Sequence, residues 1–217
     1  MDRNRVSNRR GRRSREEILE AASRIMGKRG YAATPLSVVG NEIGLAKSVI
    51  FHHFRTKSGL LAAVMERGLN DFFRAMSAAH ADPPADGTPQ ERLSWFLGRA
   101  AAVLTEREEF LRLHMFLILS EDGDEAEPDV KATIEKVRRE GRRHVNRMIR
   151  ESFRDEGPEI AQAVADKLEY IGMAGIDGVF LAGQAEESRS IAEDMELLAE
   201  TIALMGERLA ARMRSTG

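Results

Sequence analysis

The sequence predicts an all-α protein of about nine helices. Apolar residues recur three and four positions apart along most of the chain, which is the spacing of one face of a helix. No segment alternates between apolar and polar residues as a half-buried strand does. Stretches rich in proline and glycine at 81–88 and 157–158 interrupt the helical pattern. With 217 residues, 42% of them apolar, the chain is long enough for one large core or two domains.

The first helix is expected to begin at Ser14, because Ser14 and Glu17 have the S-x-x-E spacing of a capping box. Residues 1–13 are rich in Arg and Asn without apolar periodicity, so we expect a disordered basic arm. Gly30 is expected to end this helix. The pattern therefore predicts an arm at 1–13, an N-terminal domain at 14–60 and a larger helical domain at 61–217.

Residues 34–57, TPLSVVGNEIGLAKSVIFHHFRTK, predict two short helices at 36–43 and 47–53 joined by a tight turn. The opening threonine is expected to cap the first of them, with the proline in the first helical position. Gly44 supplies the backbone freedom that the turn requires. Two helices joined in this way form a helix-turn-helix, whose second helix enters the DNA major groove.

The fourth helix, starting near Lys57, is too apolar for a three-helix domain alone, and we expect it to connect the two domains. The pattern then predicts five further helices, at about 89–105, 107–120, 129–155, 159–185 and 189–213.

The charge of the chain is divided unevenly. The net charge is −2, but residues 1–57 contain 13 Lys and Arg against 5 Asp and Glu, and residues 58–217 contain 20 against 30. A basic N-terminal region on an acidic body is typical of a nucleic-acid-binding module fused to a domain with another role. A merely disordered basic tail is the alternative, since seven of the 13 basic residues lie within 1–15.

Composition excludes other classes of protein. No apolar run approaches the roughly 18 residues of a membrane span. The start, MDRNRVSNRRGRRS, lacks the apolar centre of a signal peptide, so we expect a cytoplasmic protein with no membrane partner. Without cysteine, disulfides, thiolate-bound zinc and a thiol nucleophile are excluded.

Patterns that could suggest a metal or catalytic site fail on spacing. His52 and His53 are adjacent, so on a helix they point about 100° apart, and no third ligand follows at ligand spacing. The acidic stretch at 121–128 lacks the glycine and the terminal glutamate of a calcium loop, so we expect a solvated turn. No phosphate-binding loop, G-x-S-x-G or H-E-x-x-H occurs. We therefore expect no cofactor, no metal and no catalytic residues.

Two features near the C-terminus predict an interface between two copies of the chain. A strip of small residues on the helix at 159–185 would let another helix approach closely, although a contact within one chain would explain it as well. Apolar residues of the last helix follow the 4-3-4-3 spacing of a and d positions. The residues expected at this dimer interface are Ala174, Gly178, Ala182, Met195, Leu198, Ile202 and Met205.

Several groups of residues between 14 and 61 have the order and spacing of a known family. They are Ile18-Leu19, Ala21-Ala22, Gly30-Tyr31-Ala32-Ala33-Thr34, Val39, Gly44-Leu45, Phe51-His52-His53-Phe54, Lys57 and Leu60-Leu61. This region, about a quarter of the chain, resembles the N-terminal domain of the tetracycline-repressor (TetR) family of bacterial transcription regulators. Ala46, Ser48, Val49 and Phe51 depart from the family pattern of a hydroxyl cap, Gly, Thr and Tyr.

As a helix-turn-helix, this region would hold phosphates with Lys47, His52, His53 and Lys57, and would place Ser48 or Val49 near base edges. A valine can contact a thymine methyl group but cannot donate a hydrogen bond. The full set of expected DNA contacts is Thr34, Ser37, Lys47, Ser48, Val49, Phe51, His52, His53 and Lys57, with Arg10, Arg12 and Arg13 of the arm.

The resemblance also implies a small effector enclosed among the later helices. Methionine and aromatic side chains suit an irregular apolar ligand, although plain core packing is the alternative for each of them. The residues expected to line the site are Trp95, Phe110, His114, Met148, Tyr170 and Met173, with Arg99 and Asp177 as polar anchors.

The sequence thus predicts a homodimeric, ligand-responsive transcriptional regulator, a repressor released from a palindromic operator by a small, largely apolar effector. Double-stranded DNA, a second copy and that effector are the expected partners. Two alternatives stay open. One is an architectural DNA-binding protein that uses the same arm and domain without an effector. The other is a helical small-molecule-processing enzyme, for which the sequence offers no convergent acid, base or metal groups.

Overall fold

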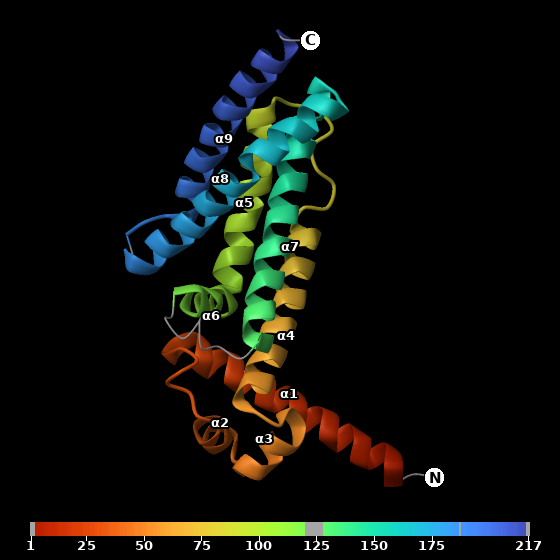
Figure 1. The fold of residues 1–217 in the computed structure, drawn as a ribbon, viewed down its shortest axis with the longest axis vertical. Helices are drawn as coiled ribbons and strands as arrows, with labels where there is room; N and C mark the ends of the chain where they lie inside the picture. Colours follow the sequence, from red (N-terminus) through yellow and green to blue (C-terminus); the bar gives the residue numbers. More distant parts are fainter. Residues whose placement is uncertain (1–2, 120–127, 187, 216–217) are drawn as a thin grey trace. The chain divides into compact units, whose positions relative to one another are not determined.

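The computed structural model describes residues 3–119, 128–186 and 188–215, without the side chains of residues 3–10, 128 and 129. Within these residues the protein is all-α, with nine α-helices, one short 3-10 helix and no strand (Figure 1). The predicted fold class is therefore confirmed. The elements are α1 (Arg3–Arg29), α2 (Leu36–Ile43), α3 (Lys47–Phe54), α4 (Lys57–Ala79), α5 (Pro89–Glu106), α6 (Glu108–Leu119), α7 (Pro128–Ser152), η2 (Arg154–Glu156), α8 (Pro158–Ala185) and α9 (Ile191–Arg214).

The helices form two compact units. Unit 1 comprises 1–73 and 107–137, and unit 2 comprises 74–106 and 138–217. The long helices α4 and α7 therefore contribute residues to both units. Unit 1 contains not only the helix-turn-helix but also α6, which packs against α1 and which we had expected in the larger domain.

The core of unit 1 is built on the apolar face of α1. Ile18, Ala22 and Met26 of this helix are fully buried, as are Val39 of α2 and Ile50 of α3. Close approach of α1 to α6 depends on Gly27, where a Cβ atom would come within 2.8 Å of the Glu109 carbonyl oxygen. The apolar face of α1 is thus covered by α2 and α3 and by α6.

Helix α1 begins at Arg3, eleven residues before the expected start at Ser14. Ser14 lies inside the helix, and its Oγ has no hydrogen-bond partner among the described residues. Glu17 pairs instead with Arg13, whose Nε lies 3.0 Å from Glu17 Oε1. Arginine favours helix, and a pair at i,i+4 supports it, so the helix continues through the segment that we had expected to be a disordered arm.

The turn before α2 also differs from the prediction. Pro35 occupies the N-cap position, and the Thr34 hydroxyl donates to the Gly30 carbonyl oxygen at 2.8 Å instead of capping the helix. At the other end of α2, Gly44 adopts the left-handed conformation with φ 66°, as the turn requires. Ala46 then caps α3 without a side-chain hydrogen bond. The predicted helix-turn-helix is confirmed, with α2 at the predicted residues.

In unit 2, α9 packs along α5 and α8. A Cβ atom on Gly175 of α8 would come within 2.4 Å of Leu198 Cδ1, so α9 lies directly on this glycine. Met195 and Ile202 are buried in the same contact. Met195 and Ile202, which we had expected between two copies, are therefore buried within one subunit, whereas Leu198 is half-buried.

No helix in the described ranges is long and apolar enough to cross a membrane. Residues 120–127, which include all but the last residue of the acidic stretch expected as a solvated turn, lie outside the described residues.

Candidate nucleic-acid interface and candidate ligand cavity

One face of α3 is exposed, and its other face anchors it to unit 1. Ile50 and Phe54 are buried. Lys47, Ser48 and His52 are exposed. The exposed residues also include Phe51, an aromatic side chain with 52% of its surface in contact with solvent. Val49 and His53 are half-buried, and Ser37 of α2 is exposed. Helix α3 thus presents a cation, a hydroxyl group, an aromatic ring and an imidazole to solvent.

His53 lies at the edge of this surface. Its ring centroid is 5.7 Å from that of His52 and 6.0 Å from that of Phe54. Burial lowers the pKa of His53, and the nearby His52 and Arg15 lower it further. The Arg15 guanidinium itself stands over the Phe54 ring at 5.2 Å. A phosphate group near His53 would oppose this lowering, because it favours the charged imidazole.

Two of the expected DNA contacts hold the turn between α1 and α2. Thr34 is fully buried. Lys57 Nζ donates to the Ala32 carbonyl oxygen at 3.1 Å and stands 4.2 Å from the centre of the Tyr31 ring. The geometry therefore gives Thr34 a structural role, and Lys57 fastens the turn behind α3.

The basic residues of α1 include Arg12 and Arg13, which are exposed. Arg13 carries the ion pair to Glu17. The side chain of Arg10 lies outside the described set.

Phe110 and His114, expected at the effector site, are buried in the core of unit 1. The Phe110 ring lies 5.7 Å from the Phe72 ring and fills the space that a side chain at Gly68 would need. The His114 ring stacks on Phe110 with 9° between the planes. Phe110 and His114 therefore fit the alternative interpretation, in which these side chains pack the core instead of lining an effector site.

Five other expected effector residues lie in unit 2, each against a partner of its own. The Arg99 guanidinium covers the Trp95 ring at 4.4 Å, and that of Arg142 covers the Tyr170 ring at 4.8 Å. Met173 packs on Gly141. Asp177 Oδ2 accepts from Arg138 Nη1 at 2.5 Å. Burial raises the pKa of Asp177, and Arg138 opposes that rise.

Unit 2 contains a cavity of about 310 Å³. Of the expected effector residues, Met148 alone lines it. The lining residues come from α4, the segment after it, α5 and α7: Ser77, His80, Pro83, Phe96, His144, Arg147, Met148, Arg150 and Glu151. Sequence analysis missed the two histidines because they are 64 positions apart and follow no ligand spacing.

The imidazoles of His80 and His144 are stacked, with centroids 5.0 Å apart, and share a hydrogen bond of 2.9 Å between His144 Nε2 and His80 Nδ1. His80 Nε2 lies 2.9 Å from the Phe96 carbonyl oxygen. Because a carbonyl only accepts, His80 Nε2 carries the proton, so in the neutral pair His144 Nε2–H donates to His80 Nδ1.

Both histidines resist protonation. Burial lowers the pKa of His144 to about 4, and the nearby His80 and Arg147 add to this. Burial likewise lowers the pKa of His80, with Arg99 adding to the effect and the Phe96 carbonyl opposing it. In the described part of the chain no three His, Cys, Asp or Glu side chains gather as metal ligands would.

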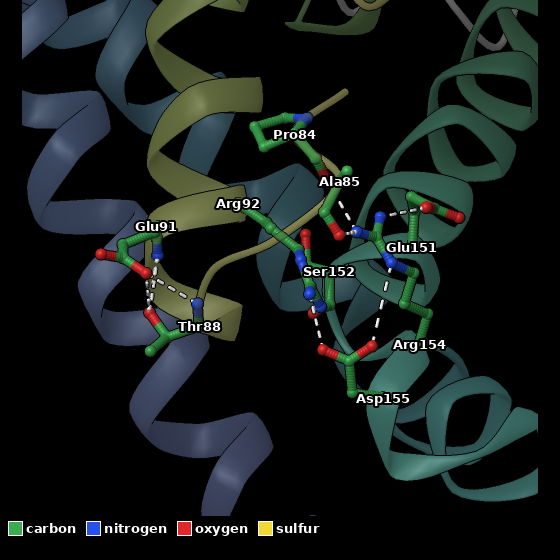
Figure 2. A network of polar contacts seen from close by, with 9 residues as sticks. All are labelled: Pro84, Ala85, Thr88, Glu91, Arg92, Glu151, Ser152, Arg154 and Asp155. Atoms are coloured by element: carbon green, nitrogen blue, oxygen red, sulfur yellow. Dashed lines mark hydrogen bonds and ion pairs between the residues drawn. The ribbon is translucent and has the colours of Figure 1, made fainter. Parts of the chain in front are cut away.

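A polar network joins Glu151, one of the lining residues, to the segment between α4 and α5 (Figure 2). Arg154 donates to Glu151 Oε1 at 2.5 Å, to the Pro84 carbonyl oxygen at 2.8 Å and to the Ala85 carbonyl oxygen. This arginine ties the segment between α4 and α5 to the end of α7. It also offsets the charge of Glu151, the carboxylate among the lining residues.

The deeper half of this network centres on Arg92, which is 2% exposed. It donates to the Ser152 carbonyl oxygen at 3.2 Å and to Asp155 Oδ2 at 2.5 Å. Thr88 and Glu91 form a reciprocal capping box at the start of α5, with Thr88 N donating to Glu91 Oε2 at 2.7 Å (Figure 2). The T-x-x-E spacing was a signal for this cap in the sequence.

The comparisons with known proteins agree with this architecture. Residues 18–64 match the family described as bacterial regulatory proteins, tetR family. The HTH-type transcriptional regulator YerO of Bacillus subtilis is 25% identical over 123 residues, which are 57% of this chain and 41% of that protein. The chain thus covers about two-fifths of that regulator. The resemblance found in the sequence is confirmed.

Solved structures share the fold. A TetR-family regulator from Agrobacterium tumefaciens has a TM-score of 0.67 and 15% identity, over 89% of this chain and 97% of that one. A transcriptional regulator from Saccharomonospora viridis, solved in complex with choline, has a TM-score of 0.63 and 19% identity, over 88% and 95% of the two chains. At these identities the likeness concerns the fold.

Proposed function

We propose that this chain, which belongs to the TetR family of helix-turn-helix transcriptional regulators, is a homodimeric repressor that leaves its palindromic operator when a small effector binds. The observation that carries the proposal is the exposed face of α3, with Lys47, Ser48, Phe51 and His52 turned to solvent. A second helix of a helix-turn-helix places such side chains in the major groove.

Within this interface the residues have different roles. Lys47, His52 and His53 bind phosphates, which fixes the position of the domain on the duplex. Ser48 and Val49 lie nearest the base edges, where the serine hydroxyl reads hydrogen-bonding groups and the valine contacts a thymine methyl. Ser37 supports the contact from α2. Thr34 and Lys57 act from behind by holding the turn that positions α2.

The basic start of α1 strengthens binding without reading the sequence. Arg12 and Arg13 are exposed on a helix that runs to Arg3. Guanidinium groups on such a segment neutralise phosphates of any sequence. Arg10 belongs to the same segment.

The proposed dimer uses the outward faces of α8 and α9. Ala174 and Gly178 are exposed, and a Cβ atom on Gly178 would meet nothing within 4 Å. Ala182 is half-buried, and Met205 is exposed on α9. The same two helices expose other large apolar side chains, which are Tyr170, Ile171, Leu181, Leu197 and Leu204. Exposed apolar side chains gathered on two helices mark a protein-protein interface.

The effector response is supported by the cavity of unit 2, whose volume of about 310 Å³ is at the lower end of the ~300–1,000 Å³ of ligand pockets. The related S. viridis structure contains choline. An architectural DNA-binding role would leave this cavity without a purpose, and the family consists of transcriptional regulators rather than enzymes.

Operator selection tests the proposal. The full-length protein is incubated with a library of random duplexes, and the retained duplexes are sequenced and footprinted. We expect a palindrome whose half-sites lie about 34–36 Å apart, on one face of the duplex. Retention of random duplexes with a diffuse footprint would favour the architectural alternative.

A further inference from the structure

We propose that the cavity of unit 2 binds a small organic anion with an apolar body, that Arg147 and Arg150 hold the anionic group, and that the His80–His144 pair takes up a proton as it binds. The proposal names the class of effector for the function proposed above. It rests on that function only where it concerns the effect of the ligand on DNA binding.

The charge of the lining favours an anion. Arg147 and Arg150 both line the cavity, and in the described residues neither forms an ion pair with a carboxylate. Arg150 Nη1 lies 3.3 Å from the neutral Gln162 Oε1. Glu151, the carboxylate of the lining, pairs with Arg154 at 2.5 Å. The cavity therefore presents two cations whose charge is not balanced, and guanidinium groups bind carboxylates well.

The remainder of the lining favours an apolar body. Phe96 and Met148 are buried and line the cavity together with Pro83. An aromatic ring and a thioether accommodate hydrocarbon of irregular shape. The cavity thus combines a cationic side with an apolar side, which matches an amphipathic anion better than an inorganic ion.

The histidine pair can accept one proton while keeping its hydrogen bond. If His80 is protonated at both nitrogens, its Nδ1–H donates to His144 Nε2. The proton that His144 carried on Nε2 is then carried on the other nitrogen of the same ring, His144 Nδ1. A second proton would place two N–H groups face to face. Without a ligand, the charges of Arg99 and Arg147 oppose the first proton. An anion in the cavity reverses that electrostatic balance.

A quaternary ammonium ion such as choline fits this cavity poorly. Recognition of such cations uses open aromatic faces. The phenyl ring of the lining, Phe96, is 5% exposed and packs against the His80 ring, with centroids 5.0 Å apart. A cation would also meet Arg147 and Arg150. The ligand class therefore differs from the choline found in the S. viridis structure.

Helices α4 and α7 each carry residues of the cavity lining and residues of unit 1. Ser77 of α4 lines the cavity, and His80 follows the end of that helix. Leu60 and Leu61 of the same helix are buried in the core of unit 1. A ligand that displaces the end of α4 thus acts on a helix that also carries part of the helix-turn-helix core.

Calorimetry on the full-length protein tests the site without DNA. The probes are butanoate, octanoate and benzoate. Octan-1-ol and choline, which lack an anionic group, and inorganic phosphate, which lacks an apolar body, are the controls. We expect at least one carboxylate to bind, at least tenfold tighter than each control. The affinity of this carboxylate should rise as the pH falls from 8 to 6, because binding takes up a proton. Since one proton is taken up, the rise is at most tenfold per pH unit.

Substitutions separate the two parts of the proposal. Arg147→Gln and Arg150→Gln should each weaken carboxylate binding about tenfold or more, since a hydrogen bond to a charged group is lost. Arg139→Gln, an exposed position of α7 outside the lining, is the matched control. His80→Gln removes the ring that takes up the proton and should bind the carboxylate with a flatter pH dependence. Circular dichroism checks that each variant is folded.

Four results would overturn the proposal: no affinity for any carboxylate, equal affinity for octan-1-ol or choline, equal affinity for phosphate, or unchanged carboxylate affinity in both arginine variants. DNA binding by a protein with no carboxylate affinity would remove this site and leave the DNA-binding function standing. Carboxylate binding that leaves operator affinity unchanged would support the site and contradict the effector response.

Discussion

His52 and His53 are neighbours in the sequence and lie at the surface of unit 1, whereas His80 and His144 of unit 2 are 64 positions apart and share a hydrogen bond. The rings of the first pair stand at 72° to each other, and those of the second pair are stacked at 25°. Burial lowers the pKa of His144 to about 4, the outcome expected when water is excluded and cations are near.

The difference shows how the two units use positive charge. On α3 the cationic groups face solvent, where they are available to a polyanion as large as DNA. In unit 2 two exposed arginines and two largely buried histidines line a cavity of about 310 Å³, the size of a small molecule. We therefore expect binding at the first surface to depend on ionic strength, and binding at the second to depend on proton uptake and desolvation. The predictions below test this contrast.

The largest effect is expected for unit 1. If six or more phosphates are neutralised per dimer, operator affinity should fall roughly 10³-fold or more between 50 and 200 mM salt. Lys47→Glu should lower the affinity and reduce the salt slope, as measured by fluorescence anisotropy. Lys131→Glu makes the same charge change at an exposed position of α7, outside both proposed interfaces, and is the control. Equal effects of the two variants would contradict a DNA interface on α3.

The next prediction concerns the outward face of unit 2. Gly178→Leu should weaken the dimer roughly 5–150-fold, because overpacking an interface costs ~1–3 kcal/mol. Gly98→Leu is the matched control, since Gly98 is also exposed on a helix and a Cβ atom there would likewise meet nothing within 4 Å. Sedimentation measures both variants. A Gly178→Leu protein that dimerises normally would place the dimer surface elsewhere.

The buried histidine pair should make the fold sensitive to acid. The pKa of His144 is about 4 in the folded protein, against about 6.5 when unfolded, so the unfolded state binds more protons between these values. Stability is therefore full above pH 6.5 and is lost as the pH falls towards 4. The loss from pH 7 to 4.5 is on the order of 2 kcal/mol for His144.

Urea titrations at several pH values measure that loss. His144→Gln should remove most of it, whereas His52→Gln, which changes an exposed histidine, should retain it. Identical acid sensitivity in wild type and His144→Gln would mean that this pair does not control stability.

The smallest effect is expected for the surface pair. The pKa of His53 is lowered by burial and by His52 and Arg15, and a bound phosphate would raise it. Operator affinity should therefore rise a few-fold as the pH falls from 8 to 6, less than the tenfold per unit of a complete proton. His53→Asn should flatten this dependence. A fall in affinity at low pH, measured where the protein stays folded, would contradict phosphate binding by His53.

Prediction from sequence succeeded where the signal is local. Helix α2 has the predicted bounds, because the glycine after it and the apolar spacing within it act over a few residues. The same reasoning misplaced the cap of that helix by one residue, since Thr34 reaches back to Gly30 instead. It also began α1 at a capping box that is not formed, because the helix begins at Arg3 and Ser14 lies inside it.

Apolar periodicity correctly marked a buried face on α9, but not what covers that face. Met195 and Ile202 pack against their own subunit, while Leu197 and Leu204, seven positions apart, stay exposed. An a/d stripe has the same spacing whether its neighbour belongs to the same chain or to another. For the same reason a methionine or aromatic residue could be assigned to a core or to a ligand site only after its neighbours were known.

The sequence alone determined the helices, the helix-turn-helix and the basic charge of the N-terminal region, because turns, caps and apolar spacing depend on residues within one or two helical turns. Only the tertiary structure brought His80 to His144, set Arg92 beside Asp155, and formed a cavity lined by Phe96 and Met148. These contacts join distant segments, and burial, which no local pattern encodes, then lowers the pKa of both histidines.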